Sequence, residues 1–176
     1  MTAPEAPVEI VPYDPSWPRL FEEEREKLLL AIGRWLAGPV EHIGSTAITG
    51  LAAKPVIDVL AGVETLEASR PAIAVLANLG YGYTPYKPEL EHWFCRPSLA
   101  FRTHHLHLVP FGSPQWIAPI AFRDYLRAHP EIAAEYGDLK QRLANQYRFD
   151  REAYTEAKGP FVTRITELAL RERGHF

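Results

Sequence analysis

The chain has very few of the residues that form covalent or metal cross-links through sulfur. Its 176 residues include one cysteine, Cys95, and one methionine. A single cysteine excludes an internal disulfide and a zinc site built from several cysteines. Such a composition is typical of a reducing compartment, and we expect a cytoplasmic protein.

The chain also lacks a basic run and a long apolar run. With 19 Lys and Arg against 22 Asp and Glu, the net charge is −3. Generic electrostatic binding to nucleic acid or to an anionic membrane is therefore not expected, although a local basic pocket is compatible with these numbers. No apolar run approaches the roughly 20 residues that span a bilayer. The first ten residues also lack the basic region and apolar core of a signal peptide.

The remaining composition fits a globular protein. Hydrophobic residues make up 47% of the chain and charged residues 23%, which are ordinary values for a globular domain. The length favours a single domain spanning residues 1–176, with residues 1–7 as a mobile tail. The 16 prolines are spread along the chain, as expected for breaks between elements.

The pattern of apolar residues predicts strands in the middle of the chain and helices toward both ends. The strands are expected at 8–11, 40–43, 55–60, 81–83, 92–96 and 101–109. Helices are expected at 17–36, 71–79, 116–129, 132–147 and 150–173, with Gly38-Pro39 ending the first and Gly159-Pro160 breaking or kinking the last. This order predicts an α+β fold, in which a mixed β-sheet is flanked by helices and the C-terminal part is helical.

The stretch from His42 to Leu60 combines a tight turn with an acidic residue in an apolar strand. Gly44-Ser45 follows a strand, and such a turn exposes backbone N–H groups that suit a phosphate oxygen. A plain tight turn is the structural alternative. Asp58 lies among aliphatic residues, where a carboxylate is costly to bury unless something binds it. Carboxylates and phosphate oxygens together suit Mg²⁺, so Asp58 is the candidate catalytic and metal-binding carboxylate.

Two histidines share one face of the strand expected at 101–109. Side chains alternate along a strand, so His105 and His107 lie on the face opposite His104. Beside the Asp58 strand, the two imidazoles and the carboxylate would suit Zn²⁺ or Mn²⁺ better than Mg²⁺. The alternative is a pair of histidines hydrogen-bonded in a polar core, and a shift of one residue in register would turn them away.

Several cations lie close in sequence to these motifs. Lys54, Arg96 and Arg102 are candidate phosphate-binding residues, together with Gly44, Ser45 and Thr46 of the turn. His42 and Lys158 are candidate supporting residues, because His42 precedes the turn and Lys158 lies one helical turn after Tyr154. For each cation the alternative is a solvated surface charge, and for His42 it is core packing.

Several blocks of the sequence resemble the GrpB family, within the nucleotidyltransferase superfamily of the DNA polymerase β type. The blocks are HIGSTA at 42–47, GLAAKP at 50–55, Ile57-Asp58, HHLH at 104–107, FRDYLR at 122–127 with His129-Pro130, YDPSW at 13–17, and Tyr154 with Lys158. The resemblance covers nearly the whole chain and implies a nucleotidyltransferase-like fold. Some relatives are fused to dephospho-CoA kinase, which implies a nucleotide or cofactor context.

The sequence departs from this superfamily at one important point. Active members carry two acidic residues on one strand, separated by a single residue, whereas the positions two away from Asp58 are Val56 and Leu60. Two metal ions need more ligands than one carboxylate offers. We therefore expect a protein that binds a nucleotide or phosphorylated small molecule, with metal-dependent nucleotidyl or phosphoryl transfer as the first reaction class. The alternatives are a non-catalytic ligand-sensing or protein-interaction module and a metal-dependent hydrolase.

Overall fold

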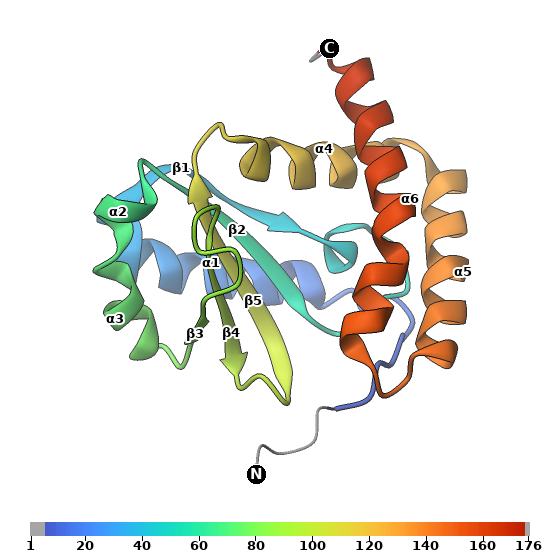
Figure 1. The fold of residues 1–176 in the computed structure, drawn as a ribbon, viewed down its shortest axis with the longest axis horizontal. Coiled ribbons are helices and arrows are strands. Elements are labelled where there is room, and N and C mark those ends of the chain that lie inside the picture. Colours follow the sequence, from blue (N-terminus) through green and yellow to red (C-terminus); the bar gives the residue numbers. More distant parts are fainter. Residues whose placement is uncertain (1–5, 175–176) are drawn as a thin grey trace.

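The computed structural model describes residues 6–174 and has an α+β fold built on one five-stranded mixed sheet (Figure 1). The strand order is β1-β2-β5-β4-β3, in which β2 and β5 run parallel and the other neighbours antiparallel. The strands are β1 (Leu36–Ile43), β2 (Ile57–Val63), β3 (Gly82–Thr84), β4 (His92–Pro97) and β5 (Arg102–Pro110). The helices are α1 (Trp17–Ile32), α2 (Leu66–Ser69), α3 (Ala72–Ala77), α4 (Pro114–Ala128), α5 (Pro130–Gln146) and α6 (Arg151–Glu172), with 3-10 turns η1 (Gly33–Trp35) and η2 (Ser45–Ala47).

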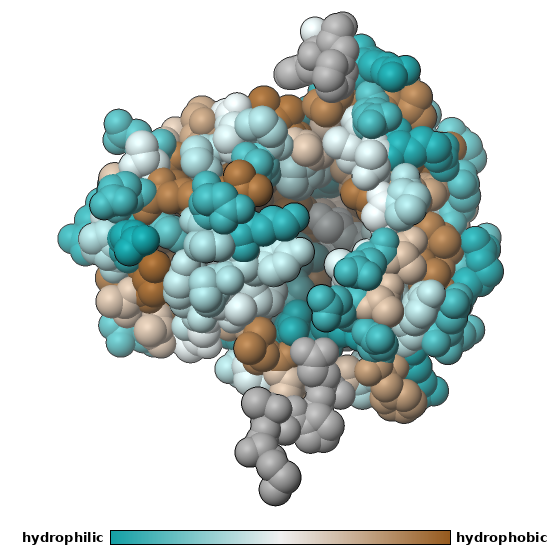
Figure 2. All heavy atoms as spheres, in the orientation of Figure 1, coloured by the Kyte–Doolittle hydropathy of each residue, from teal (hydrophilic) through white to brown (hydrophobic). Residues whose placement is uncertain are grey.

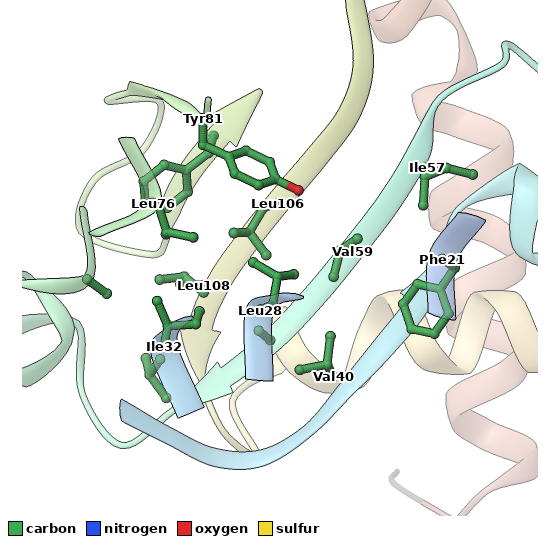
Figure 3. Close-up of a cluster of buried hydrophobic side chains, with 14 of the residues drawn as sticks. Phe21, Leu28, Ile32, Val40, Ile57, Val59, Leu76, Tyr81, Leu106 and Leu108 are labelled. Carbon is green, nitrogen blue, oxygen red and sulfur yellow. The ribbon is translucent and has the colours of Figure 1, made fainter. Parts of the chain in front are cut away.

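One face of the sheet is covered by α1 and α3 and forms the main hydrophobic core (Figure 3). Leu28 and Ile32 of α1 are fully buried there against Val59 and Leu106 of the two central strands. Burial of a side chain of this size contributes about 1.5–3 kcal/mol. Alternation along the strands therefore sends the neighbouring positions, Asp58 among them, to the opposite face.

Helix α4 packs on the opposite face, and α5 and α6 pack against α4. Trp116 of α4 packs on Leu60 and Val109, while α5 and α6 lie side by side next to the sheet in Figure 1. Asp150 caps α6 as expected, because its Oδ1 accepts a hydrogen bond from the N–H of Ala153 at 2.9 Å. No helix within residues 6–174 is long and apolar enough to cross a membrane.

Three expectations about element boundaries are wrong. The first helix ends at Ile32, and Gly38 and Pro39 lie inside β1, which accepts proline because it is an edge strand. The last helix runs unbroken through Gly159-Pro160. Helix α4 likewise continues through Pro119, which follows Ala118, so proline does not by itself end either helix.

The N-terminal expectations are met only in part. The strand expected at 8–11 is a single bridge, in which Val11 pairs with Ala53. Residues 1–5 of the expected tail lie outside the described part of the chain. Ala6 donates its backbone N–H to the carbonyl of Ala100 at 2.9 Å.

Candidate functional site

The site is centred on a hydrogen bond between Asp58 and His105. Because β2 and β5 pair in parallel, Asp58 lies directly opposite His105, and Asp58 Oδ1 is 2.8 Å from His105 Nδ1. His107 lies on the same face, but its Nδ1 is 2.6 Å from Glu91 Oε2. The structure therefore brings Asp58 and His105 together and gives His107 a different carboxylate partner.

The charge states of this pair follow from its surroundings. Burial alone would raise the pKa of Asp58, but the hydrogen bond with His105 and the nearby cations hold it below its usual value. Burial lowers the pKa of His105, and Asp58 only partly opposes this shift. At neutral pH the pair is a carboxylate and a neutral imidazole, so Nδ1 carries the proton and donates it to Asp58.

Gly44 allows the tight turn to approach Asp58. Its backbone has φ 71° and ψ −174°, a conformation that is essentially restricted to glycine. A Cβ added at Gly44 would lie only 2.4 Å from Asp58 Oδ2. The glycine is therefore needed both for the backbone conformation and for the space that the carboxylate fills.

Helix α4 holds the backbone on both sides of this turn. Arg123 Nη1 donates to the carbonyl of His42 at 2.9 Å, and Arg127 Nη2 donates to the carbonyl of Ala47 at 2.7 Å. Inside the turn, His42 Nε2 lies 2.9 Å from Thr46 Oγ1, which donates to the carbonyl of Val56. Burial lowers the pKa of His42 to about 4. His42 is therefore neutral at pH 7 and supports the turn from the α1 side of the sheet.

A pocket of about 210 Å³ opens beside the Asp58–His105 pair. In the space-filling view, the surface is hollowed between the sheet and the helices α5 and α6 (Figure 2). The turn, the segment before β2, the Asp58–His105 pair and helices α4, α5 and α6 supply its walls. The residues are Gly44, Ser45, Thr46, Lys54, Val56, Asp58, His105, Phe122, Tyr136, Lys140, Tyr154, Thr155 and Lys158. Three lysines and one carboxylate thus line the same small space.

The lysines are crowded enough to shift one another's ionisation. Burial, followed by repulsion from neighbouring cations, lowers the pKa of Lys54 to about 7 and that of Lys140 to about 7. Burial also lowers the pKa of Lys158, against a weaker opposing effect of Asp58. Lys140 is only 2% exposed and donates to the carbonyl of Ala52. The pocket therefore holds more potential positive charge than its single carboxylate balances.

The structure does not bring two of the predicted phosphate-binding residues into the pocket. Arg96 lies on the α1 side of the sheet, where its Nη2 is 2.6 Å from Glu24 Oε2, a carboxylate that is 1% exposed. Arg102 donates to the carbonyl of Leu99 and lies over the ring of Trp93, outside the pocket walls. Of the predicted set, the pocket walls contain Gly44, Ser45, Thr46, Lys54, Asp58, His105 and Lys158.

Sequence reasoning missed Lys140 and Tyr136 on α5. Lysines inside amphipathic helices are usually solvated, so Lys140 carries no strong signal by itself. Its spacing was informative, however, because Lys140 follows Tyr136 by one helical turn on the apolar side of α5. Tyr154 and Lys158 of α6 repeat this spacing, so each helix presents one tyrosine and one lysine to the pocket.

The donor atoms of the site do not match the metal set predicted from the sequence. Asp58 and His105 hydrogen-bond to each other, and His107 is paired with Glu91. Within residues 6–174, no group of three or more His, Cys, Asp or Glu side chains is arranged to hold a metal ion. Lysine ammonium groups beside Asp58 also repel a cation. The described part of the chain therefore offers no ready set of ligands for a metal ion at this site.

The fold and site together define a class of protein. It is an α+β protein in which a Gly-Ser turn, a strand carboxylate and a lysine-rich pocket meet at one face of a mixed sheet. The family model described as GrpB protein matches residues 7–168. The chain belongs to the GrpB family, and its placement in the nucleotidyltransferase superfamily is consistent with that membership.

Individual relatives agree with this assignment. The chain is 38% identical to a UPF0157 protein of Pseudomonas aeruginosa, over 96% of this chain and 70% of that protein. It is 36% identical to the glutamate-rich protein GrpB of Alkalihalophilus pseudofirmus, over 89% of this chain and 92% of that protein. The crystal structure of the conserved protein GrpB from Enterococcus faecalis superposes with a TM-score of 0.86 and 34% identity, covering 94% of this chain and 99% of that one.

A more distant similarity concerns dephospho-CoA kinases. The chain is 30% identical to the dephospho-CoA kinase of Mycolicibacterium paratuberculosis, over 89% of this chain but only 44% of that protein. The similarity therefore covers less than half of the kinase. It bears out the expected likeness to a part of such proteins and carries no activity over to this chain.

Proposed function

We propose that the pocket binds the phosphate group of a phosphorylated small molecule or nucleotide. The observation that carries this proposal is the convergence of Lys54, Lys140 and Lys158 on one pocket with a single carboxylate, Asp58. Buried cations are costly unless they are paired or lose their protons. A bound phosphate would pair with them and allow the lysines to be protonated together.

The turn supplies the second half of the phosphate site. Gly44 and Ser45 line the pocket, and a strand-to-turn junction of this kind presents backbone N–H groups and a hydroxyl. Charge-assisted hydrogen bonds from lysine to phosphate are roughly twice as strong as neutral ones. The lysines would then supply most of the affinity, and the turn would fix the orientation of the phosphate.

The size of the pocket limits what it can enclose. Pockets that bury a whole drug-sized ligand typically have volumes of about 300–1,000 Å³, whereas this one has about 210 Å³. The phosphate-bearing part of a ligand fits that space. The base of a nucleotide would lie at the mouth of the pocket, where the contacts are fewer.

Phosphoryl or nucleotidyl transfer is the reaction class that these residues support. Such reactions depend mainly on positioning and on stabilising the charge of the transferred group, and lysines beside a phosphate do both. The second candidate is a non-catalytic ligand-binding module. This candidate is favoured by the lack of a second carboxylate on the Asp58 strand. The positions two residues away are occupied by the buried aliphatic residues Val56 and Leu60, which are 6% and 1% exposed.

Calorimetry in several buffers tests the binding proposal. Inorganic phosphate, pyrophosphate and ATP would be titrated into the protein at pH 8, in buffers with different ionisation enthalpies. Lysines with a pKa of about 7 are mostly neutral at this pH, so phosphate binding should take up protons and the observed heat should depend on the buffer. Mg²⁺, Mn²⁺ and Zn²⁺ would be compared with a chelator in separate titrations.

Matched lysine variants separate the pocket from general charge effects. Lys54→Met and Lys158→Met should weaken phosphate binding roughly 10- to 100-fold, because each removes a charge-assisted hydrogen bond. Lys87→Met serves as the control, since Lys87 is not among the pocket residues. Equal affinity in all three variants would contradict the proposal. Turnover of ATP or pyrophosphate by the wild-type protein would decide for transfer and against the non-catalytic module.

A further inference from the structure

One polar atom at the site has no partner. His105 lines the pocket and donates from Nδ1 to Asp58, while its Nε2 is buried and has no hydrogen-bond partner among the described residues. Buried polar atoms are nearly always satisfied, so an exception needs an explanation. Nδ1 of His107 is 2.6 Å from Glu91 Oε2, and the buried ring nitrogen without a partner on this face is Nε2 of His105.

The hydrogen bond with Asp58 determines which nitrogen of His105 can react. With the proton on Nδ1, the lone pair of the neutral imidazole lies on Nε2. The carboxylate also fixes the orientation of the ring, which packs against Trp93 with the ring centroids 5.3 Å apart. A carboxylate-oriented imidazole with a free lone pair is the arrangement of a general base or a nucleophile.

We propose that His105 is the nucleophile of this pocket and that Nε2 accepts a phosphoryl group from the bound ligand. This inference rests on the proposed phosphate-binding function. In the step, the Nε2 lone pair forms an N–P bond, and the P–O bond to the leaving group breaks. The leaving oxygen keeps the electron pair. No proton leaves the imidazole, so the phosphorylated ring is a cation whose Nδ1–H still donates to Asp58.

The surroundings suit both charges that the step creates. The positive charge on the ring develops next to the Asp58 carboxylate, which accepts its hydrogen bond. Lys54 and Lys158 line the same pocket as His105, and their Nζ atoms lie 5.1 Å and 4.5 Å from the ring centroid of Tyr154. The negative charges on the phosphoryl and leaving oxygens develop in this pocket, beside the two lysines. Fixed charges placed where charge develops are the main source of enzymatic stabilisation.

Tyr154 adds a second unsatisfied group to the same pocket. It is fully buried, and its hydroxyl has no hydrogen-bond partner among residues 6–174. Burial raises its pKa, so the hydroxyl keeps its proton and can only donate or accept as a neutral group. A donor hydroxyl on a ring that Lys54 and Lys158 both approach fits an anionic oxygen of the ligand. The two unsatisfied groups thus call for complementary partners, which a phosphoryl group and its leaving oxygen supply.

A covalent label tests the proposal without knowledge of the natural ligand. The wild-type protein would be incubated with phosphoramidate, a small phosphoryl donor that fits the pocket and releases ammonia. Acid-labile, alkali-stable phosphohistidine would be located by mass spectrometry of peptides, and its rate of formation would be followed at each of the seven histidines. We expect His105 to be labelled fastest, despite its burial, and inorganic phosphate to slow the labelling by occupying the pocket.

Two variants and one control isolate the roles of the pair. His105→Gln should abolish the fast label, whereas His104→Gln should not, because His104 faces the other side of the sheet beside Arg96. Asp58→Asn preserves the shape of the side chain, but its amide can donate to Nδ1 and move the proton to Nε2. A wrong tautomer of this kind should slow labelling by about 10² or more.

The results separate this proposal from the one on which it depends. If calorimetry shows phosphate binding but His105 is labelled no faster than His104, the nucleophile assignment is wrong and the binding function stands. If phosphate does not bind, both proposals fail. Fast labelling of His105 that phosphate does not slow would also contradict the proposal, because the label would then arise outside the pocket.

Discussion

Replacement of Gly44 by alanine should damage both stability and ligand binding. The backbone of Gly44 has φ 71° and ψ −174°, and a non-glycine residue in this region costs about 1–3 kcal/mol. The added Cβ would also lie 2.4 Å from Asp58 Oδ2, so the carboxylate must move away from His105. With the loss of that charged hydrogen bond, we expect a total of about 3–5 kcal/mol in the free energy of unfolding.

Gly50 offers a matched control for the backbone cost alone. It also has a positive φ, 80°, but a Cβ there meets no heavy atom within 4 Å. Gly50→Ala should cost about 1–2 kcal/mol and leave phosphate affinity unchanged, whereas Gly44→Ala should weaken phosphate binding more than tenfold. Urea unfolding followed by the fluorescence of the four tryptophans gives the stabilities, and calorimetry gives the affinities. Equal losses in the two variants would refute the argument that Gly44 makes room for Asp58.

Three further predictions concern charged residues at different distances from the pocket. Because burial lowers the pKa of Lys54 from 10.5 to about 7, the unfolded chain binds a proton there that the folded chain lacks. That part of the stability should rise from pH 7 to 10 by up to about 1.4 kcal/mol per pH unit, and Lys54→Met should remove it in unfolding curves across this range. Arg127 donates a hydrogen bond to the carbonyl of Ala47 in the turn, so Arg127→Met should weaken phosphate binding about tenfold and cost about 1 kcal/mol of stability. Arg164→Met removes an exposed ion pair and should change neither the affinity in calorimetry nor the stability in unfolding curves. Arg96→Met should cost about 3 kcal/mol in chemical denaturation, because it leaves the buried Glu24 without its closest cation. Its phosphate affinity should equal that of the wild type, and weaker binding would show that Arg96 contributes to the phosphate site.

The parts of the fold that follow from local patterns were predictable from the sequence. Alternation along 101–109 placed His105 and His107 on the same face, and both do lie on the face of Asp58. The cap at Asp150 depended only on its neighbours. The break expected at Gly159-Pro160 does not occur, and α4 also continues through Ala118-Pro119. The packing of these helices outweighs the local effect of proline, which the sequence pattern alone does not reveal.

The parts of the site that depend on long-range packing could not be predicted in the same way. The sequence does not specify that β2 and β5 pair in parallel with Asp58 opposite His105, since that register is set by the whole sheet. The sequence also does not show which carboxylate pairs with each lysine or arginine. Arg96 is close in sequence to the histidines but pairs with Glu24 of α1, across the sheet from the pocket, whereas Lys140 is distant in sequence and reaches the pocket.

The balance of charge distinguishes the Glu24 cluster on one face of the sheet from the Asp58 cluster on the other. On the α1 side, Glu24 is 1% exposed, and it accepts hydrogen bonds from Arg96 at 2.6 Å and from the Tyr81 hydroxyl at 2.8 Å. That cluster is satisfied by its own members, so its role is to join α1 to the sheet. On the opposite face, Asp58 has its partner in His105, yet three lysines remain beside it in a pocket without a second carboxylate. Lysines in such a pocket either lose their protons or pair with an anion. A bound phosphate is the anion that would allow all three to be charged together, which is why we propose binding for this face and structure for the other.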